Sequence, residues 1–337
     1  MTPAHGALEQ RCVGKSGLCV SVLGLGAAPL GGMYERSSDA AAVETVRAAL
    51  KADITLFDVA PHYGQGLAEY RLGRGLAQTR SGGCVVSTKV GRLLHPAAEP
   101  PSSTMWPEAL PFATVYDVSR AGILRSLRDS RERVGRDIFE ILLLHDPDRY
   151  ADGPTMLRRL ISEAYGTLSA LRENGQVKAI GIGANSPEVG LAALELGQWD
   201  CFLLAGTYSV LEQNDQGLLD RCARSSVSVL IGGPYMSGAL AGGTTWRYRP
   251  IPTEIAARIA ALRDICRDHR IPLQAAALQF PLLHPAVASV IVGMRSADEV
   301  GENVAFLRQP IPDEFWEILL SEGFIVERRS MARRHNS

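Results

Sequence analysis

The sequence lacks an excess of charge of either sign. Its 337 residues contain 35 Lys and Arg against 36 Asp and Glu, for a net charge of −1. Such a balance supplies no field that would steer the chain onto nucleic acid or an anionic membrane. It also lacks any run of about 18 apolar residues, and its start, MTPAHGALEQR, has no basic stretch followed by an apolar one. We therefore predict no membrane span, no signal peptide and a cytoplasmic location.

Cysteine is scarce, and no Cys-x-x-Cys pair occurs among the six residues at positions 12, 19, 84, 201, 222 and 266. In a chain of this length, a dispersed set argues against a disulfide frame and a zinc site, and it predicts buried, reduced thiols. The segment HDPDRYADG at 145–153 carries carboxylates, but it lacks the glycine that a calcium loop has at its sixth position and the glutamate that closes such a loop. We predict no metal site.

The glycine fingerprint of dinucleotide-binding sheets is missing too. The nearest match, at 24–29, has proline where the third glycine should stand. No helix is expected before Asp39, so no helix N-terminus is available for a phosphate, and a Rossmann fold is excluded.

Short apolar runs alternate with helical patterns along almost the whole chain. Because most runs are nearly continuous Val, Ile and Leu, they are typical of parallel strands covered on both faces. Eight such units predict an α/β fold, a (β/α)8 TIM barrel. The expected strands are 20–25, 54–58, 84–89, 138–145, 177–182, 201–205, 228–231 and 287–292, and the helices 39–51, 67–79, 120–134, 155–174, 188–196, 216–225, 254–270 and 297–307.

Several features lie outside this repeat. We expect an N-terminal β-hairpin around 11–20, helix caps at Ser119, Ser186 and Ser296, and an extra C-terminal helix at 313–323. The long connection 92–117 is interpreted as a lid loop because it holds aromatic residues. Residues 1–337 are predicted to form one domain with a core at 11–324 and a solvated basic tail at 327–337.

Polar residues with catalytic chemistry stand where three neighbouring strands end. Asp58 and then Tyr63 follow the second strand, Lys89 ends the third, and His145 ends the fourth. The carboxyl ends of barrel strands form the active-site face. We therefore predict that these four residues converge on one rim.

The segments around these residues, TLFDVAPHYGQGLAEYRLGRGLA, VVSTKVGRLL and FEILLLHDPD, resemble the signature segments of the aldo-keto reductase superfamily. The resemblance maps that family's catalytic tetrad onto Asp58, Tyr63, Lys89 and His145. Further segments, such as DCFLLAGTYSVLEQ and IGGPYMSG, resemble NAD-dependent aldose 1-dehydrogenases, which oxidise L-fucose and related D-threo-aldoses. This implies hydride transfer from the anomeric carbon of a sugar to NAD, with a lactone as product.

The residue chemistry agrees with that implication. Moving a hydride from a carbinol also moves one proton at the same oxygen, and Tyr63 can exchange it. The free pKa of a tyrosine is about 10, and an adjacent lysine ammonium lowers it by favouring the phenolate. Asp58 is expected to orient Lys89, and His145 to hydrogen-bond the substrate oxygen. His62 is not expected to contribute, because adjacent residues rarely point into one site.

The resemblance further implies a dinucleotide lying across the barrel mouth. Tyr208 is expected to stack on the nicotinamide, the segment 233–240 to wrap the pyrophosphate, and the segment 293–303 to hold the adenosine. Trp106 is expected to contact the substrate with Tyr63 and His145. The complete set of expected cofactor residues is Gly26, Ala28, Asp58, Asn185, Tyr208, Gly233, Ser237, Gly238, Leu240, Gly293, Arg295, Glu299 and Asn303.

Two departures from the family pattern carry information. NADPH-preferring members have basic residues where this chain has Gly293 and Glu299. Because Glu299 would repel a 2′-phosphate, we predict NAD as the cofactor, although Glu299 also completes a capping box with Ser296. The Ser-Asn and Gln that usually hold the carboxamide are replaced by Ala184-Asn185 and by Ala205, so Asn185 is expected to take over.

Three alternatives stay open. Pyridoxal 4-dehydrogenase is an NAD-using relative with the same tetrad and a lactone product. A general NADPH-dependent carbonyl reductase is disfavoured by Glu299. A non-enzymatic role like that of potassium-channel β subunits is disfavoured by the complete tetrad.

Overall fold

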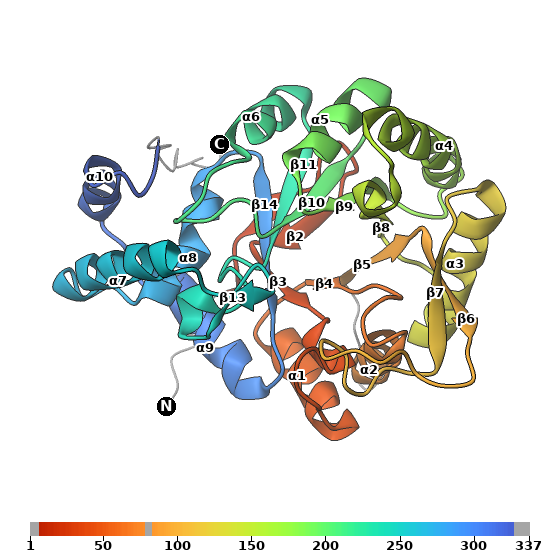
Figure 1. The fold of residues 1–337 in the computed structure, drawn as a ribbon, viewed down its shortest axis with the longest axis horizontal. Helices are drawn as coiled ribbons and strands as arrows, with labels where there is room; N and C mark the ends of the chain where they lie inside the picture. The colour runs from red at the N-terminus through yellow and green to blue at the C-terminus, as the bar shows by residue number, and fades with distance from the viewer. Residues whose placement is uncertain (1–6, 78–82, 327–337) are drawn as a thin grey trace.

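Eight parallel strands close into a barrel at the centre of the molecule (Figure 1). The structure is a computed structural model that describes residues 7–77 and 83–326. Neighbouring strands follow the order β10-β11-β14-β3-β4-β5-β8-β9, and β9 pairs with β10 to complete the ring. The strands are β3 (Leu23–Gly26), β4 (Leu56–Asp58), β5 (Val85–Val90), β8 (Ile141–His145), β9 (Ala179–Ala184), β10 (Cys201–Ala205), β11 (Ser228–Gly232) and β14 (Val287–Gly293).

Helices surround this barrel, and the predicted (β/α)8 fold is confirmed (Figure 1). One helix, α8, was not expected. It packs against α9, and α7 lies outside it. No helix in the two described stretches is long and apolar enough to cross a bilayer. The helices are α1 (Asp39–Lys51), α2 (Leu67–Ala77), α3 (Arg120–Val134), α4 (Pro154–Glu173), α5 (Pro187–Leu196), α6 (Gln216–Ser225), α7 (Thr253–Asp268), α8 (Leu273–Gln279), α9 (Ala297–Arg308) and α10 (Asp313–Ser321).

Two of the three predicted helix caps form as expected. The hydroxyls of Ser119 and Ser296 accept hydrogen bonds from the backbone N–H of Gly122 and Glu299. Ser186 occupies the N-cap of α5, but its side chain makes no capping bond. Short 3-10 turns complete the connections at Pro29–Gly31, Pro147–Tyr150, Ala239–Ala241 and Phe280–Leu283.

The predicted N-terminal hairpin is present as β1 (Gln10–Cys12) and β2 (Cys19–Ser21). The single strand expected at 20–25 is wrong: it divides into β2 and β3. Ser21 exchanges hydrogen bonds with Thr55, its Oγ accepting from the Thr55 N–H, which anchors the chain at the boundary between β2 and β3. Burial of all six thiols is also wrong. Cys12 and Cys19 are exposed, with sulfurs 3.3 Å apart, because they face each other across this hairpin.

The connection at 92–117 is not an unstructured loop. It folds into an antiparallel hairpin of β6 (Arg92–Pro96) and β7 (Phe112–Tyr116), at the right of Figure 1 beside α3. The alternation of half-buried and exposed residues along FATVY is the period-two signal of a strand. A smaller hairpin, β12 (Thr245–Trp246) and β13 (Arg249–Pro250), follows β11. The basic tail at 327–337 lies outside the described residues.

The alternation of side chains along each strand determines which residues point into the barrel. Leu56, Val85 and Leu143 belong to the barrel's inner cluster, which the hairpin residue Val13 joins. Their sequence neighbours Phe57, Val86, Leu142 and Leu144 belong to the layer between strands and helices. Because side chains alternate along a strand, Asp58, Lys89 and His145 point inward with the first set, at the carboxyl end of the barrel.

Candidate active site

Asp58 and Lys89 form a buried ion pair inside the barrel mouth. The Lys89 Nζ donates to Asp58 Oδ2 at 2.7 Å and to the Val59 carbonyl at 3.0 Å. The other oxygen of Asp58 accepts from the Ser87 hydroxyl at 2.5 Å. Burial opposes the charge of Lys89, but Asp58 and Tyr63 more than offset it and raise the pKa of the ammonium above its usual value. Lys89 is therefore a fixed cation.

Tyr63 lies beside this cation on the loop between β4 and α2. Lys89 Nζ is 4.8 Å from the centre of the Tyr63 ring. The loop is pressed against the segment after β3, where a Cβ at Gly31 would come within 2.8 Å of the Tyr63 carbonyl oxygen. Burial raises the pKa of Tyr63 to about 12, although Lys89 lowers it. The expected effect of Lys89 is present, but burial outweighs it.

His145 is a buried, neutral imidazole next to Tyr63. Their rings lie 6.2 Å apart and nearly perpendicular. Burial, reinforced by the positive charges of Arg92 and Lys89, holds the pKa of His145 well below its usual value. Its Nδ1 is buried with no hydrogen-bond partner among the described residues. Such a group does not serve as a cation near neutral pH, but it can hydrogen-bond a substrate oxygen.

The expectation that His62 points away from the site is wrong. The ring of His62 lies 6.2 Å from His145 and 6.0 Å from Trp106, so both His62 and Tyr63 flank the same space. Because this loop is not an extended strand, successive side chains do not point to opposite sides, so His62 and Tyr63 can face the same space. Burial lowers the pKa of His62 to about 4.

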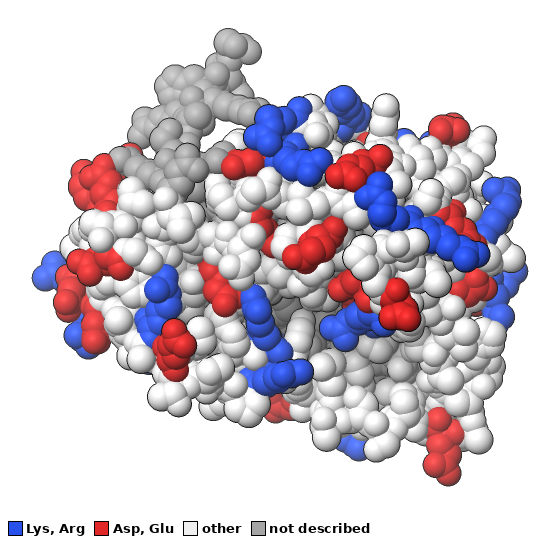
Figure 2. All heavy atoms as spheres, turned by 45° about the horizontal axis from the view of Figure 1, so that its top comes forward, with Lys and Arg blue, Asp and Glu red and all other residues white. Residues whose placement is uncertain are grey.

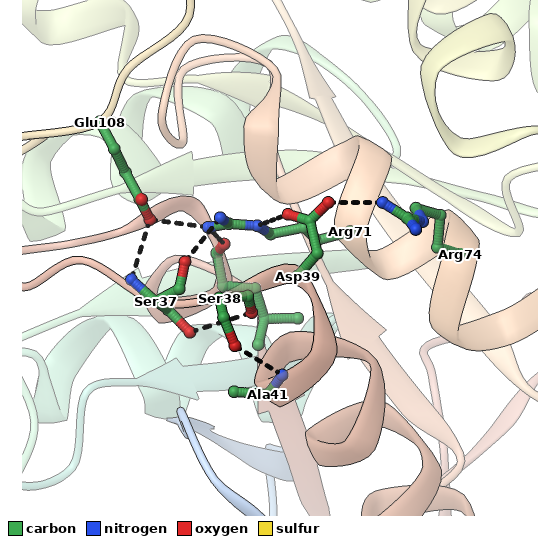
Figure 3. Close-up of polar contacts among 8 residues, drawn as sticks. Ser37, Ser38, Asp39, Ala41, Arg71, Arg74 and Glu108 are labelled. Atoms are coloured by element: carbon green, nitrogen blue, oxygen red, sulfur yellow. Dashed lines mark hydrogen bonds and ion pairs between the residues drawn. The ribbon is translucent and has the colours of Figure 1, made fainter.

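Trp106 is stacked on the ring of Tyr63, with the two ring centres 5.9 Å apart. The segment that carries it, between β6 and β7, is fixed by a buried arginine on α2 (Figure 3). Arg71 donates to Glu108 at 2.7 Å, to the Ser37 carbonyl at 2.7 Å and to Asp39 at 2.9 Å. Thus one guanidinium ties the Trp106 segment to the loop after β3.

A cavity of about 820 Å³ opens beside Asp58 and Tyr63 and extends to α9. Its size suits a large ligand. Figure 2 shows acidic and basic side chains intermingled on one face, which matches the balanced composition. The expected cofactor residues that line the cavity are Gly26, Ala28, Asp58, Asn185, Gly233, Ser237, Gly238, Gly293, Arg295, Glu299 and Asn303.

Two expected cofactor residues lie elsewhere. Tyr208 is buried and stacks on Phe280 at 5.3 Å, and Leu240 is fully buried in the core. Neither residue lines the cavity. The cavity wall also does not include Trp106, Lys89 and His145. In the two described stretches, no group of three or more potential metal-ligating side chains is arranged around a common point.

Several cavity residues were not found from the sequence. Tyr34, Arg149 and Tyr248 line the same cavity as Tyr63. Tyr248 lies at the tip of the β12–β13 hairpin, in a left-handed conformation with φ 65. Its segment, RYRP, carries no strand or helix period, so the sequence offered no signal beyond an aromatic residue in a loop.

At the far end of the cavity, Glu299 and Arg295 are paired with each other. The Glu299 carboxylate accepts from the Arg295 backbone N–H at 2.9 Å and lies 3.3 Å from its guanidinium. Arg295 also pairs with Glu35 at 2.7 Å. The predicted capping box is half correct: Ser296 caps the Glu299 N–H, but the return bond goes to Arg295. The cavity's basic group at this end is thus held between two carboxylates.

Comparison with known proteins agrees with this architecture. The model of the aldo/keto reductase family matches residues 22–321. The chain belongs to the aldo/keto reductase family. It is 40% identical to pyridoxal 4-dehydrogenase of Microbacterium luteolum, covering 95% of this chain and 98% of that protein. It is 35% identical to D-threo-aldose 1-dehydrogenase of a Pseudomonas species, covering 92% and 96%.

Solved structures support the fold of this aldo/keto reductase. An aldo-keto reductase from Bacillus halodurans, in its holo form, aligns with a TM-score of 0.75 at 24% identity, covering 98% of this chain and 100% of that one. The glycerol dehydrogenase of Gluconobacter oxydans aligns with a TM-score of 0.73 at 21% identity, covering 93% and 95%. This family uses nicotinamide cofactors and small-molecule substrates, so the chain is an oxidoreductase.

Proposed function

We propose that this aldo/keto reductase oxidises the anomeric carbon of an aldose with NAD and yields a lactone. The observation that carries the proposal is the convergence of Tyr63, Lys89, Asp58 and neutral His145 at the barrel mouth, beside the cavity. A cyclic sugar presents a hemiacetal carbon that bears a hydrogen and a hydroxyl. Loss of the hydrogen on carbon as a hydride, and of the hydroxyl hydrogen as a proton, leaves the oxygen as the carbonyl of a ring ester.

Tyr63 accepts the proton of that hydroxyl. Lys89, whose Nζ lies 4.8 Å from the centre of the Tyr63 ring, favours the phenolate form that accepts this proton, and Asp58 keeps the lysine charged and in place. His145 donates a hydrogen bond to the same oxygen, which orients the carbon toward the cofactor. A neutral imidazole can donate this hydrogen bond through its N–H while the proton of the hydroxyl passes to Tyr63.

The cavity residues fit a nicotinamide dinucleotide. The wall includes Asp58 and Tyr63 at the barrel mouth, Glu299 and Asn303 of α9, and the glycines of 233–238, where small residues admit a pyrophosphate. A bound nicotinamide supplies the hydride acceptor. Glu299 favours NAD, because the carboxylate can accept from ribose hydroxyls, whereas a 2′-phosphate would meet like charge and an arginine already paired.

Pyridoxal is the second candidate, favoured by the 40% identity to pyridoxal 4-dehydrogenase over 95% of the chain. Pyridoxal closes to a cyclic hemiacetal through its neighbouring hydroxymethyl group. Its oxidation therefore uses the same carbon–hydroxyl chemistry and also gives a lactone.

The test is a substrate panel with the purified protein. L-fucose, L-galactose, D-arabinose and pyridoxal are each offered with NAD and with NADP, and absorbance at 340 nm is followed. Turnover of a sugar with NAD is the expected result. Turnover of pyridoxal alone would select the second candidate, and inactivity with all four would refute the proposal.

A further inference from the structure

We infer that Asp146 is a positioning residue that fixes the side-chain amide of Asn185 for the carboxamide of the nicotinamide. The inference rests on the proposed nicotinamide-dependent function. Asp146 directly follows His145 at the end of β8, and Asn185 follows β9, the next strand of the barrel. Nothing in the proton transfer above uses Asp146.

Asp146 is held tightly at this point. It adopts a left-handed conformation with φ 43, and its backbone N–H donates to the Gly183 carbonyl at 2.8 Å. Its side chain is buried, and the two carboxylate oxygens have different partners. Oδ2 accepts from Arg92 at 2.6 Å and lies 3.3 Å from Arg149. Oδ1 accepts from the Asn185 Nδ2 at 3.0 Å.

This arrangement determines which way the amide points. An ionised carboxylate only accepts hydrogen bonds, so Asn185 must present its NH2 group to Asp146. The amide carbonyl of Asn185 is then left to accept from another donor, and Asn185 lines the cavity. The NH2 of a nicotinamide carboxamide is such a donor.

The neighbouring positions make this hydrogen bond more important. Ala184 and Ala205, next to Asn185 and across from it on β10, offer no side-chain hydrogen bonds. With alanine at both positions, the orientation of the Asn185 amide matters more for a hydrogen bond to the carboxamide.

Asp146→Asn tests the inference without disturbing the backbone, since asparagine tolerates the left-handed conformation. Arg92 and Asn185 donate to different oxygens of Asp146, and the single carbonyl oxygen of an asparagine can occupy only one of these two positions. When the oxygen of the introduced asparagine accepts from Arg92, its NH2 group faces Asn185. The Asn185 amide is then favoured in the reversed orientation, with its own oxygen toward position 146. We expect the Kd of the binary complex with NADH, measured by fluorescence, to rise by up to about 10-fold, the loss of one neutral hydrogen bond between the Asn185 amide oxygen and the carboxamide.

A double-mutant cycle separates positioning from a general loss of structure. In an Asn185→Ala background, Asp146→Asn should leave the Kd for NADH unchanged, because the group it positions is absent. The matched control is Asp200→Asn. Asp200 is also buried and paired, with Arg172 at 2.8 Å, but it lies before β10 at the opposite end of the barrel. That variant should lower the melting temperature without changing the Kd.

An exchange of the two side chains provides the second test. Asn185→Asp should weaken NADH binding by placing two carboxylates together. Adding Asp146→Asn to it restores one donor facing one acceptor and should recover most of the affinity. Unchanged binding in Asp146→Asn, or no recovery in the exchanged protein, would overturn the inference. If the unmutated protein bound neither NADH nor NADPH, the proposed function itself would fail.

Discussion

Replacing Glu299 by arginine should convert the cofactor preference of this aldo/keto reductase. Glu299 does two things at the far end of the cavity: it repels a second negative charge and it holds the Arg295 guanidinium, at 3.3 Å. Glu299→Arg removes both effects and adds a planar donor that matches a phosphate. One charge-assisted hydrogen bond is worth about 1.5–3 kcal/mol, which corresponds to roughly 10–150-fold in kcat/KM.

Glu299→Arg should also lower the stability of the protein. Glu299 accepts from the Arg295 backbone N–H in the first turn of α9. Losing that bond and placing a cation at a helix N-terminus should destabilise the protein by about 1 kcal/mol. Because this loss affects the apoprotein equally with either cofactor, it does not enter the ratio of the two kcat/KM values.

The assay compares kcat/KM for NAD and NADP with one sugar, in the parent, in Glu299→Arg and in Asp298→Arg. Asp298 is the preceding residue of the same turn, outside the cavity wall. It therefore controls for the added charge and for the helix. The parent should prefer NAD, and only Glu299→Arg should shift toward NADP. A parent enzyme that uses both cofactors equally would refute the reasoning and leave Glu299 as a helix cap.

Four further results are expected. Tyr63→Phe should lower kcat at least about 100-fold with NADH affinity unchanged in fluorescence titration; turnover near that of the parent would remove Tyr63 from proton transfer. Sugar oxidation should rise toward alkaline pH, since the pKa of Tyr63 is about 12, and Lys89→Met should move the pH–rate profile further to alkaline pH; an unmoved profile would make Lys89 purely structural. Glu108→Gln should weaken a charge-assisted bond of Arg71 worth about 1.5–3 kcal/mol, seen as a lower melting temperature and a higher KM for the sugar; an unchanged KM would separate Trp106 from substrate binding. A thiol reagent should label Cys12 and Cys19 quickly in the native protein but not the four buried cysteines; labelling of all six would contradict the packing.

Local pattern predicted most of the barrel. Helices α1, α3 and α6 begin and end where their apolar period and flanking residues indicate. Helix α8 was missed because LQAAALQ is short and largely apolar, which gives no amphipathic contrast. The β6–β7 hairpin was missed because the Pro and Ser residues of this segment are typical of a loop. The burial of side chains along its second strand nevertheless alternates as in a strand.

Asp58, Lys89 and His145 could be placed because strand parity and their position at strand ends fix them. Tyr248 and Arg149 could not, since each reaches the cavity from a turn, and no periodicity describes where turn side chains point. Tyr208 is the opposite case, a residue that was expected in the cavity but lies elsewhere. The family resemblance implied that its ring stacks on the nicotinamide, but the ring packs against Phe280 and does not line the cavity, an outcome decided by tertiary packing.

The charges along the cavity support an uncharged substrate. Its basic wall residues are Arg149, Arg247 and Arg295. Each is paired with a carboxylate, Arg149 with Asp146 at 3.3 Å, Arg247 with Glu212 at 2.5 Å, and Arg295 with Glu35 at 2.7 Å. A phosphorylated substrate would have to displace one of these carboxylates, whereas the hydroxyl groups of a free sugar or of pyridoxal need only donors and acceptors of hydrogen bonds. Because paired guanidinium groups keep N–H donors while losing net attraction for anions, these three arginines are better suited to the hydroxyl groups of an uncharged substrate than to the phosphate of a phosphorylated one.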